Sequence, residues 1–103
     1  MPYRGTQESI TYKIQRESLY IQHRQSYENA SEQLTILQKA LSEYEKSEIT
    51  IKAAYLKQYV SFNTYLQVLK QALSVKKQII LMQIQKAKEA ILINAIASGM
   101  VYQ

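Results

Sequence analysis

The fold of this 103-residue chain is decided by one short stretch, Tyr59-Val60-Ser61-Phe62-Asn63-Thr64. On both sides of it the sequence permits helix, because there is no proline or glycine from Thr6 to Ser98. The stretch itself combines β-branched and polar residues, which are weak helix formers. One continuous helix would leave its apolar side chains without a partner. We therefore expect an all-α fold, a long antiparallel helical hairpin of the coiled-coil kind, with its reversal in residues 60–64.

Capping signals place the ends of the second arm. Thr64 and Gln67 have the spacing of a capping box, which favours a helix start at Thr64. Ser98-Gly99 predicts the end, because glycine readily takes the left-handed conformation that follows a helix. The predicted parts are a single domain over residues 1–103, a loose leader over 1–7, a first arm over about 8–60, a tip at 60–64 and a second arm over about 64–98.

Apolar residues recur with the 3-4 spacing of a coiled coil in both arms. In the first arm one heptad position is apolar except at Glu48, and its members are Tyr20, Tyr27, Leu34, Leu41 and Tyr55. The partner position holds Ala30, Leu37, Tyr44 and Ile51. The apolar stripe predicted for the second arm is Leu66, Leu69, Leu73, Ile80, Ile84, Ala87, Ile91 and Ala95. These two stripes are expected to pack on each other.

The two predicted arms differ in length. A second arm of about 35 residues pairs with residues from about 28 to 60, so residues 8–27 extend beyond it. Tyr20 and Tyr27 would then lack a partner in the same chain, as would Ile10, Ile14 and Ile21. A two-helix hairpin also has little core of its own. We expect self-association, or a larger parent protein of which this sequence is a fragment.

Composition argues against a cofactor or catalytic site. The chain has no cysteine and one histidine, His23, so neither a disulfide framework nor a thiolate metal site is available. Within one helical turn of His23 lie only Ser18, Tyr20 and Ser26, which do not form a catalytic set. There is no glycine-rich phosphate loop. We expect no enzyme activity, no metal and no cofactor, with His23 in the seam or on the surface.

The charge pattern bears on the partners. The net charge is +5, and residues 65–103 hold five lysines against Glu89 alone. The lysines are scattered and the arginines few, which indicates a solvated lysine face and no specific nucleic-acid binding. No apolar stretch follows residues 1–5, so no secretory signal is expected, and the most apolar stretch, residues 90–97, is too short to span a membrane.

The centre of the chain also resembles a known family. Residues 59–69 read YVSFNTYLQVL. They resemble the tip signature of TolC-like outer-membrane efflux proteins, a basic residue and a tyrosine, then a glycine and a run ending in Tyr-Leu-Glu-Val-Leu. Residues 45–56 look like the helix entering that tip, and residues 71–99 are similar to the return helix and its small-residue stop. The likeness covers about residues 15–99 and is nearest to the heavy-metal-efflux branch, the CzcC/CusC type.

The sequence departs from the family pattern at the tip. Ser61 stands where the family has its glycine, and Tyr59 lies one place nearer to it than usual. Family members often carry acids just past the tip, where they ring a closed pore. Here the matching positions are Gln67 and Lys70, so such a ring of pore-facing residues would be neutral or basic.

The resemblance implies a structural role. The chain would be one of two hairpin repeats of a longer protein, a trimer whose hairpins form an α-helical tunnel through the periplasm. Its tip would dock a periplasmic adaptor protein, and it would meet the outer membrane only through missing parts of the parent protein. The expected partner-binding residues are Tyr59, Ser61, Phe62, Asn63, Thr64 and Tyr65.

The residues by themselves leave alternatives open. Tyr59 and Tyr65 suit either packing or partner contact, and Phe62 suits either docking or a plug between the arms. The alternative function is a free-standing cytoplasmic helical-hairpin adaptor or secretion chaperone that acts through coiled-coil contacts. A third is a basic coiled coil that binds nucleic acid or lipid.

Overall fold

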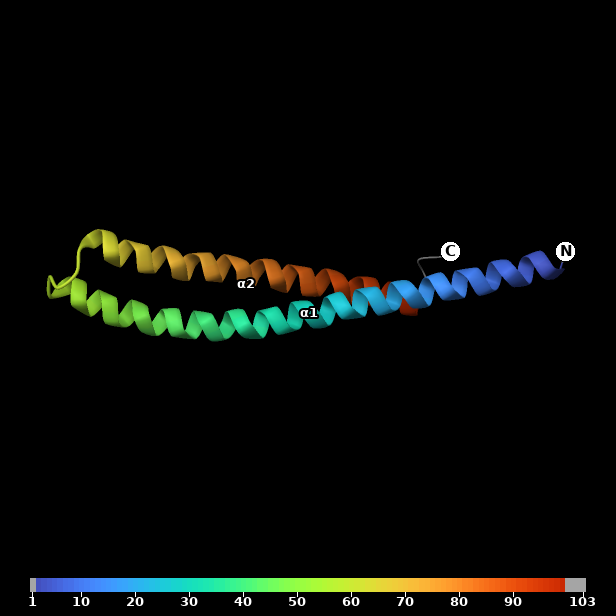
Figure 1. Cartoon of the computed structure of the whole chain (residues 1–103), viewed down its shortest axis with the longest axis horizontal. Helices are drawn as coiled ribbons and strands as arrows, with labels where there is room; N and C mark the ends of the chain where they lie inside the picture. The colour runs from blue at the N-terminus through green and yellow to red at the C-terminus, as the bar shows by residue number, and fades with distance from the viewer. Residues whose placement is uncertain (1, 100–103) are drawn as a thin grey trace. The chain divides into compact units, whose positions relative to one another are not determined.

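The computed structural model describes the backbone of residues 2–99 and the side chains of residues 9–99. This part of the chain consists of two helices and contains no strand, α1 (Pro2–Leu56) and α2 (Phe62–Ala97). A short turn reverses the chain between them, and the fold is the expected helical hairpin (Figure 1). Two compact units make it up, one of residues 31–83 and the other of residues 1–30 with 84–103.

The helix ends differ from the prediction by a few residues. Helix α1 already begins at Pro2, where the sequence predicted a loose leader over residues 1–7. Proline is well suited to the first turn of a helix, because no intrahelical hydrogen bond needs its missing amide there. Helix α1 ends at Leu56 rather than near residue 60, and α2 begins at Phe62 rather than Thr64. The reversal therefore occupies residues 57–61, about three residues earlier than predicted.

The unit of residues 31–83 contains the turn and a small apolar core. Leu34 of α1 packs with Val75 and Ile79 of α2, and all three side chains are buried. The half-buried residues around them are Leu37, Leu41, Tyr44 and Met82. The seam predicted for α1 is confirmed, because each of its members is buried or half-buried. The exception, Glu48, is half-buried as well.

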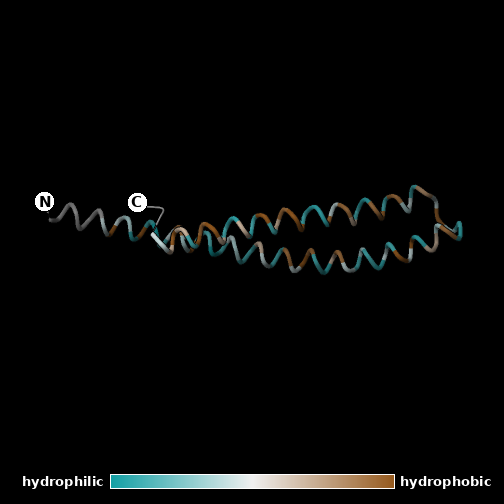
Figure 2. The backbone as a smooth tube through the Cα atoms, turned by 180° about the vertical axis from the view of Figure 1, so that it is seen from behind, coloured by the Kyte–Doolittle hydropathy of each residue, from teal (hydrophilic) through white to brown (hydrophobic). Residues whose placement is uncertain are grey.

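The face that α2 turns toward α1 is not the predicted one. Ten buried or half-buried positions keep a regular 3-4 spacing along it, and they are Tyr65, Val68, Ala72, Val75, Ile79, Met82, Lys86, Glu89, Ile93 and Ile96. Of the predicted stripe only Leu66, Leu69 and Ala95 are half-buried. The other five, which we call the outer face of α2, are exposed: Leu73, Ile80, Ile84, Ala87 and Ile91. Since α2 is the more hydrophobic helix (Figure 2), it has apolar residues for two faces.

The unit of residues 1–30 and 84–103 pairs the end of α2 with α1 further toward the N-terminus than predicted. Ile96 is 2% exposed, and with Ala97 it lines a surface groove together with Arg16, Tyr20 and Ile21 of α1. The predicted overhang of residues 8–27 is therefore too long, because Tyr20 and Tyr27 do have partners on α2. Ile21 is nevertheless 63% exposed, and Ile10 and Ile14, further toward the N-terminus, are exposed as well. The helix stop is confirmed, with Gly99 at φ 77° and its amide donating to the Ile96 carbonyl at 3.0 Å.

Candidate functional site

The hairpin tip begins with an unusual helix end. Gln58 has a φ of 63°, in the left-handed region that residues with a Cβ seldom adopt. Its amide donates to the Tyr55 carbonyl at 2.9 Å, and the Tyr59 amide donates to the Ala54 carbonyl at 2.8 Å. Together these two bonds form a Schellman motif with Gln58 at the position that usually holds glycine. No glycine marks this helix end, so its position could not be predicted from residue types.

The start of α2 is capped by Ser61, not by Thr64. The Ser61 Oγ accepts a hydrogen bond from the Thr64 amide at 3.2 Å and lies 3.0 Å from the Thr64 hydroxyl oxygen. The Ser61 carbonyl accepts the first helical bond, from the Tyr65 amide at 3.1 Å. The predicted cap was wrong because serine and threonine are both good N-cap residues and stand three residues apart. With Ser61 as the cap, Thr64 lies in the first turn of α2.

Three aromatic rings cluster where the arms meet the tip. Tyr55 of α1 stacks on Tyr65 of α2, with ring centroids 5.1 Å apart and planes 6° from parallel. Phe62 tilts against the same Tyr55 ring at a centroid distance of 6.0 Å. Aromatic pairs of this kind stabilise a contact beyond the area they bury, by about 0.5–1.5 kcal/mol. The cluster ties the two helix ends to each other across the turn.

The expected partner-binding residues separate into two groups by exposure. Ser61, Asn63 and Thr64 are exposed, and among the large side chains Tyr59 is 79% and Phe62 55% exposed. Tyr65 is half-buried by its stacking. Gln67 and Lys70, the residues matched to the pore ring, are both exposed. Tyr59 and Phe62 thus give the tip an apolar surface that the described part of the chain does not cover.

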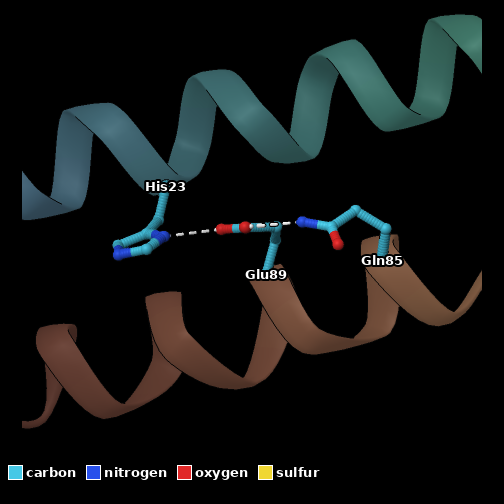
Figure 3. A network of polar contacts seen from close by, with 3 residues as sticks. All are labelled: His23, Gln85 and Glu89. Atoms are coloured by element: carbon cyan, nitrogen blue, oxygen red, sulfur yellow. Dashed lines mark hydrogen bonds and ion pairs between the residues drawn. The ribbon is translucent and has the colours of Figure 1, made fainter. Parts of the chain in front are cut away.

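A second feature lies in the other unit, where a polar pair sits in the helix–helix seam (Figure 3). The His23 Nδ1–H donates to Oε2 of Glu89 at 2.6 Å, and the Gln85 side-chain amide donates to Oε1 of Glu89 at 2.9 Å. Glu89 is only 6% exposed, which is rare for a carboxylate and requires such partners. Beside the pair, the Lys86 Nζ lies 5.3 Å from the centroid of the Tyr27 ring, a cation–π contact.

The heptad pattern predicts that His23 lies in the helix–helix seam, but it does not predict this for Glu89. His23 stands one heptad before Ala30, so it belongs to the first-arm seam. The stripe predicted for the second arm does not include Glu89, so no pattern in the sequence placed it in the seam. The charged pairs on the surface of α1 are of a different kind, since Arg24–Glu28 and Lys46–Glu43 are exposed and local to the helix. Such pairs contribute little to stability.

Other kinds of site find no support in the described residues. Nowhere between residues 9 and 99 do three histidine, aspartate or glutamate side chains gather as metal ligands would. Neither helix, over the residues that the structure describes, is long and apolar enough to cross a membrane. No family model, no curated protein and no solved structure matches the chain. The function must therefore be argued from the tip, the seam and the exposed faces.

Proposed function

We propose that this hairpin is a structural part of the periplasmic α-helical tunnel of a trimeric, TolC-like outer-membrane efflux channel, and that its tip docks a periplasmic adaptor protein. It carries no catalytic site in this role. The observation that supports the proposal best is the outer face of α2, an apolar coiled-coil surface left without a partner in the hairpin. The resemblance of residues 59–69 to the family's tip supplies the particular kind of assembly.

The balance of buried and exposed apolar side chains supports lateral partners. Among the residues whose side chains are described, six hydrophobic residues are buried and fifteen large ones are exposed. The exposed set includes four residues of the outer face, Leu73, Ile80, Ile84 and Ile91, at 47–68% exposure. Scattered exposed apolar residues are ordinary, but rows at coiled-coil spacing mark an interaction surface. A second helix laid along the outer face would remove these residues from water.

Charge favours α1 of a neighbouring copy as that second helix. In the unit of residues 31–83, α2 carries Lys70, Lys76 and Lys77 and no acid, so two α2 helices would oppose like charges. Helix α1 offers Glu32 and Glu43, which share one face with the exposed Ile36 and with two lysines, Lys39 and Lys46, so this face carries both signs of charge. The acidic side chains suit the lysines of α2, and the pairing joins unlike surfaces. A contact between two unlike surfaces can repeat from copy to copy. The copies close into a ring when the rotation between neighbours divides a full turn evenly.

The tip supports an end-on partner. Tyr59 and Phe62 are large, apolar and exposed, and the polar Ser61, Asn63 and Thr64 surround them. An aromatic centre with a polar rim is typical of protein interfaces. Phe62 also touches Tyr55, so its ring is held in place before a partner arrives. If the tips gather round a tunnel mouth, Gln67 and Lys70 line it with neutral and basic groups instead of acids.

The proposal is tested in the full-length protein that contains this chain, expressed with its adaptor in a Gram-negative host. This chain has no cysteine, so single cysteines can be placed at will. Asn63→Cys at the exposed tip should cross-link to the adaptor, whereas the matched control Ser74→Cys, also exposed but on the flank of α2, should cross-link copies of the channel to one another.

The outcomes separate the proposal from its alternative. The channel is supported if the cysteine at residue 63 cross-links to the adaptor and the cysteine at residue 74 gives cross-linked species up to a trimer of the channel. A protein recovered in the cytoplasm, with tip adducts to cytoplasmic proteins only, contradicts it and supports the helical-hairpin adaptor or secretion chaperone.

A further inference from the structure

The tip of the hairpin belongs to a long stretch of sequence without acidic residues. Residues 49–88 carry seven lysines, whereas all eight acidic residues of the chain lie outside this stretch. Three of the lysines are close to the turn and exposed: Lys52 one helical turn before the end of α1, Lys57 at the start of the reversal and Lys70 in the third turn of α2. The acid nearest to the turn in sequence, Glu48, is half-buried. The tip is therefore basic.

Large apolar side chains are exposed at the same end of the molecule. Leu56, the last residue of α1, is 70% exposed, and it stands next to Lys57 in the sequence. Tyr59 in the turn and Phe62 at the start of α2 are exposed as well. Apolar anchors beside exposed charges of one sign fit a partner that offers an apolar pocket and charges of the opposite sign at its edge.

The composition of the tip favours an acidic protein over other anionic partners. Residues 49–88 contain no arginine, which phosphate and nucleic-acid sites use for its paired donors. Clusters that bind an anionic lipid surface carry about four to eight basic residues, and the tip has three. The Phe62 ring is already held against Tyr55, which lowers the entropy cost of entering a shaped pocket. A folded protein supplies such a pocket.

We propose that the partner of the tip presents an acidic surface with an apolar pocket. Phe62 and Tyr59 enter the pocket, and carboxylates at its edge pair with Lys52 and Lys57. The inference rests on the proposed function, in which this partner is the adaptor protein, and it adds the chemistry of the adaptor's docking face. Charges at the edge of an interface act mainly on the rate of encounter and on its salt dependence. The lysines should therefore control how fast the tip meets its partner.

The test measures how fast the full-length protein with Asn63→Cys cross-links to the adaptor. Each rate is divided by the rate at which the same thiol reacts with a small neutral maleimide, so that changes in thiol reactivity cancel. The normalised rate should fall at least about fivefold between about 50 and 500 mM salt, because salt screens the attraction between exposed charges. Lys57→Glu should lower it by a similar factor at low salt, and Lys57→Arg should preserve it. The control Lys13→Glu makes the same charge change at an exposed residue of the other unit and should have little effect.

The outcomes distinguish failure of the inference from failure of the proposed function. If adducts form but their rate is indifferent to salt and to Lys57→Glu, the adaptor docks and the inference is overturned. If no adduct forms in any variant, the proposed function fails, and the chain alone decides the inference. Its tip amides, followed by nuclear magnetic resonance at low salt, should then shift on addition of poly-L-glutamate, and they should shift less in Lys57→Glu. No shift with poly-L-glutamate would overturn the inference, and shifts with phosphatidylglycerol vesicles alone would identify a membrane surface as the partner instead.

Discussion

Gln58→Gly should stabilise the hairpin, because the residue at this position has a left-handed backbone. A residue with a Cβ loses about 1–2 kcal/mol in that conformation, and glycine does not. Glycine in turn costs about 0.4–1 kcal/mol through the greater freedom of the unfolded chain. The Schellman hydrogen bonds of Gln58 and Tyr59 are made by the backbone and are retained. We expect a net gain of about 0.5–1 kcal/mol in the free energy of unfolding.

The gain is measured by urea and thermal unfolding followed by circular dichroism, at one fixed protein concentration because association would shift the midpoint. For a chain of this size it corresponds to a rise in Tm of about 2–8 °C. Gln58→Ala is the first control and should not stabilise, because it keeps the Cβ. Lys57→Gly is the second and should destabilise by about 0.5–1 kcal/mol, because the Lys57 amide still makes a helical bond to the Ala53 carbonyl at 3.2 Å. If Gln58→Gly behaves like Lys57→Gly, the assignment of a left-handed residue to position 58 is wrong.

Four further outcomes are expected. Ser61→Ala should lower the free energy of unfolding by about 1 kcal/mol, because the helix cap is lost, and Thr64→Ala should lower it by clearly less. An equal loss in the two variants would mean that Thr64 is the cap after all. Phe62→Ala should cost less than about 1.5 kcal/mol, well short of the 3–5 typical of a buried phenylalanine, because the ring is 55% exposed; severe unfolding would identify a core plug. Analytical ultracentrifugation at tens of micromolar should show a species heavier than the 12.0 kDa monomer, and a clean monomer would contradict it. Binding to mixed-sequence DNA, titrated at rising salt, should be about micromolar or weaker; tight, sequence-selective binding would contradict this.

The sequence sufficed for the hairpin and for the packing face of α1. The absence of helix breakers and one stretch of weak helix formers specify two long helices, and the heptad positions from Tyr20 to Tyr55 are all buried or half-buried in the structure. These predictions succeeded because the seam rows of α1 stay apolar nearly throughout, whereas its other large apolar residues, such as Ile21, Ile36 and Ile49, are isolated and exposed.

Neither the conformation of the tip nor the packing face of α2 could be predicted, and the reasons differ. At the tip the decisive residue, Gln58, has no propensity for the backbone it adopts, and two equivalent cap residues stand three positions apart. In α2 two stripes have the same period, and the predicted one, which holds more leucine and isoleucine, is mostly exposed. The contact that places the polar Glu89 in the seam joins residues 23 and 89, which are far apart in sequence, and it becomes visible only when the helices are paired.

The angle between the two faces of α2 bears on the size of any ring that it joins. A heptad turns about 103° per residue, so the centre of the outer face, set by positions 73, 80, 84 and 91, lies about 154° from the centre of the buried face. A helix in a closed ring meets one neighbour on each side, and the angle between its contacts widens with the number of helices. Four helices require about 90° and twelve about 150° by simple polygon geometry applied to coiled-coil seams. The proposed trimer, with two hairpins in each chain, would have twelve helices, so the angle on α2 fits that proposal better than it fits a compact four-helix bundle.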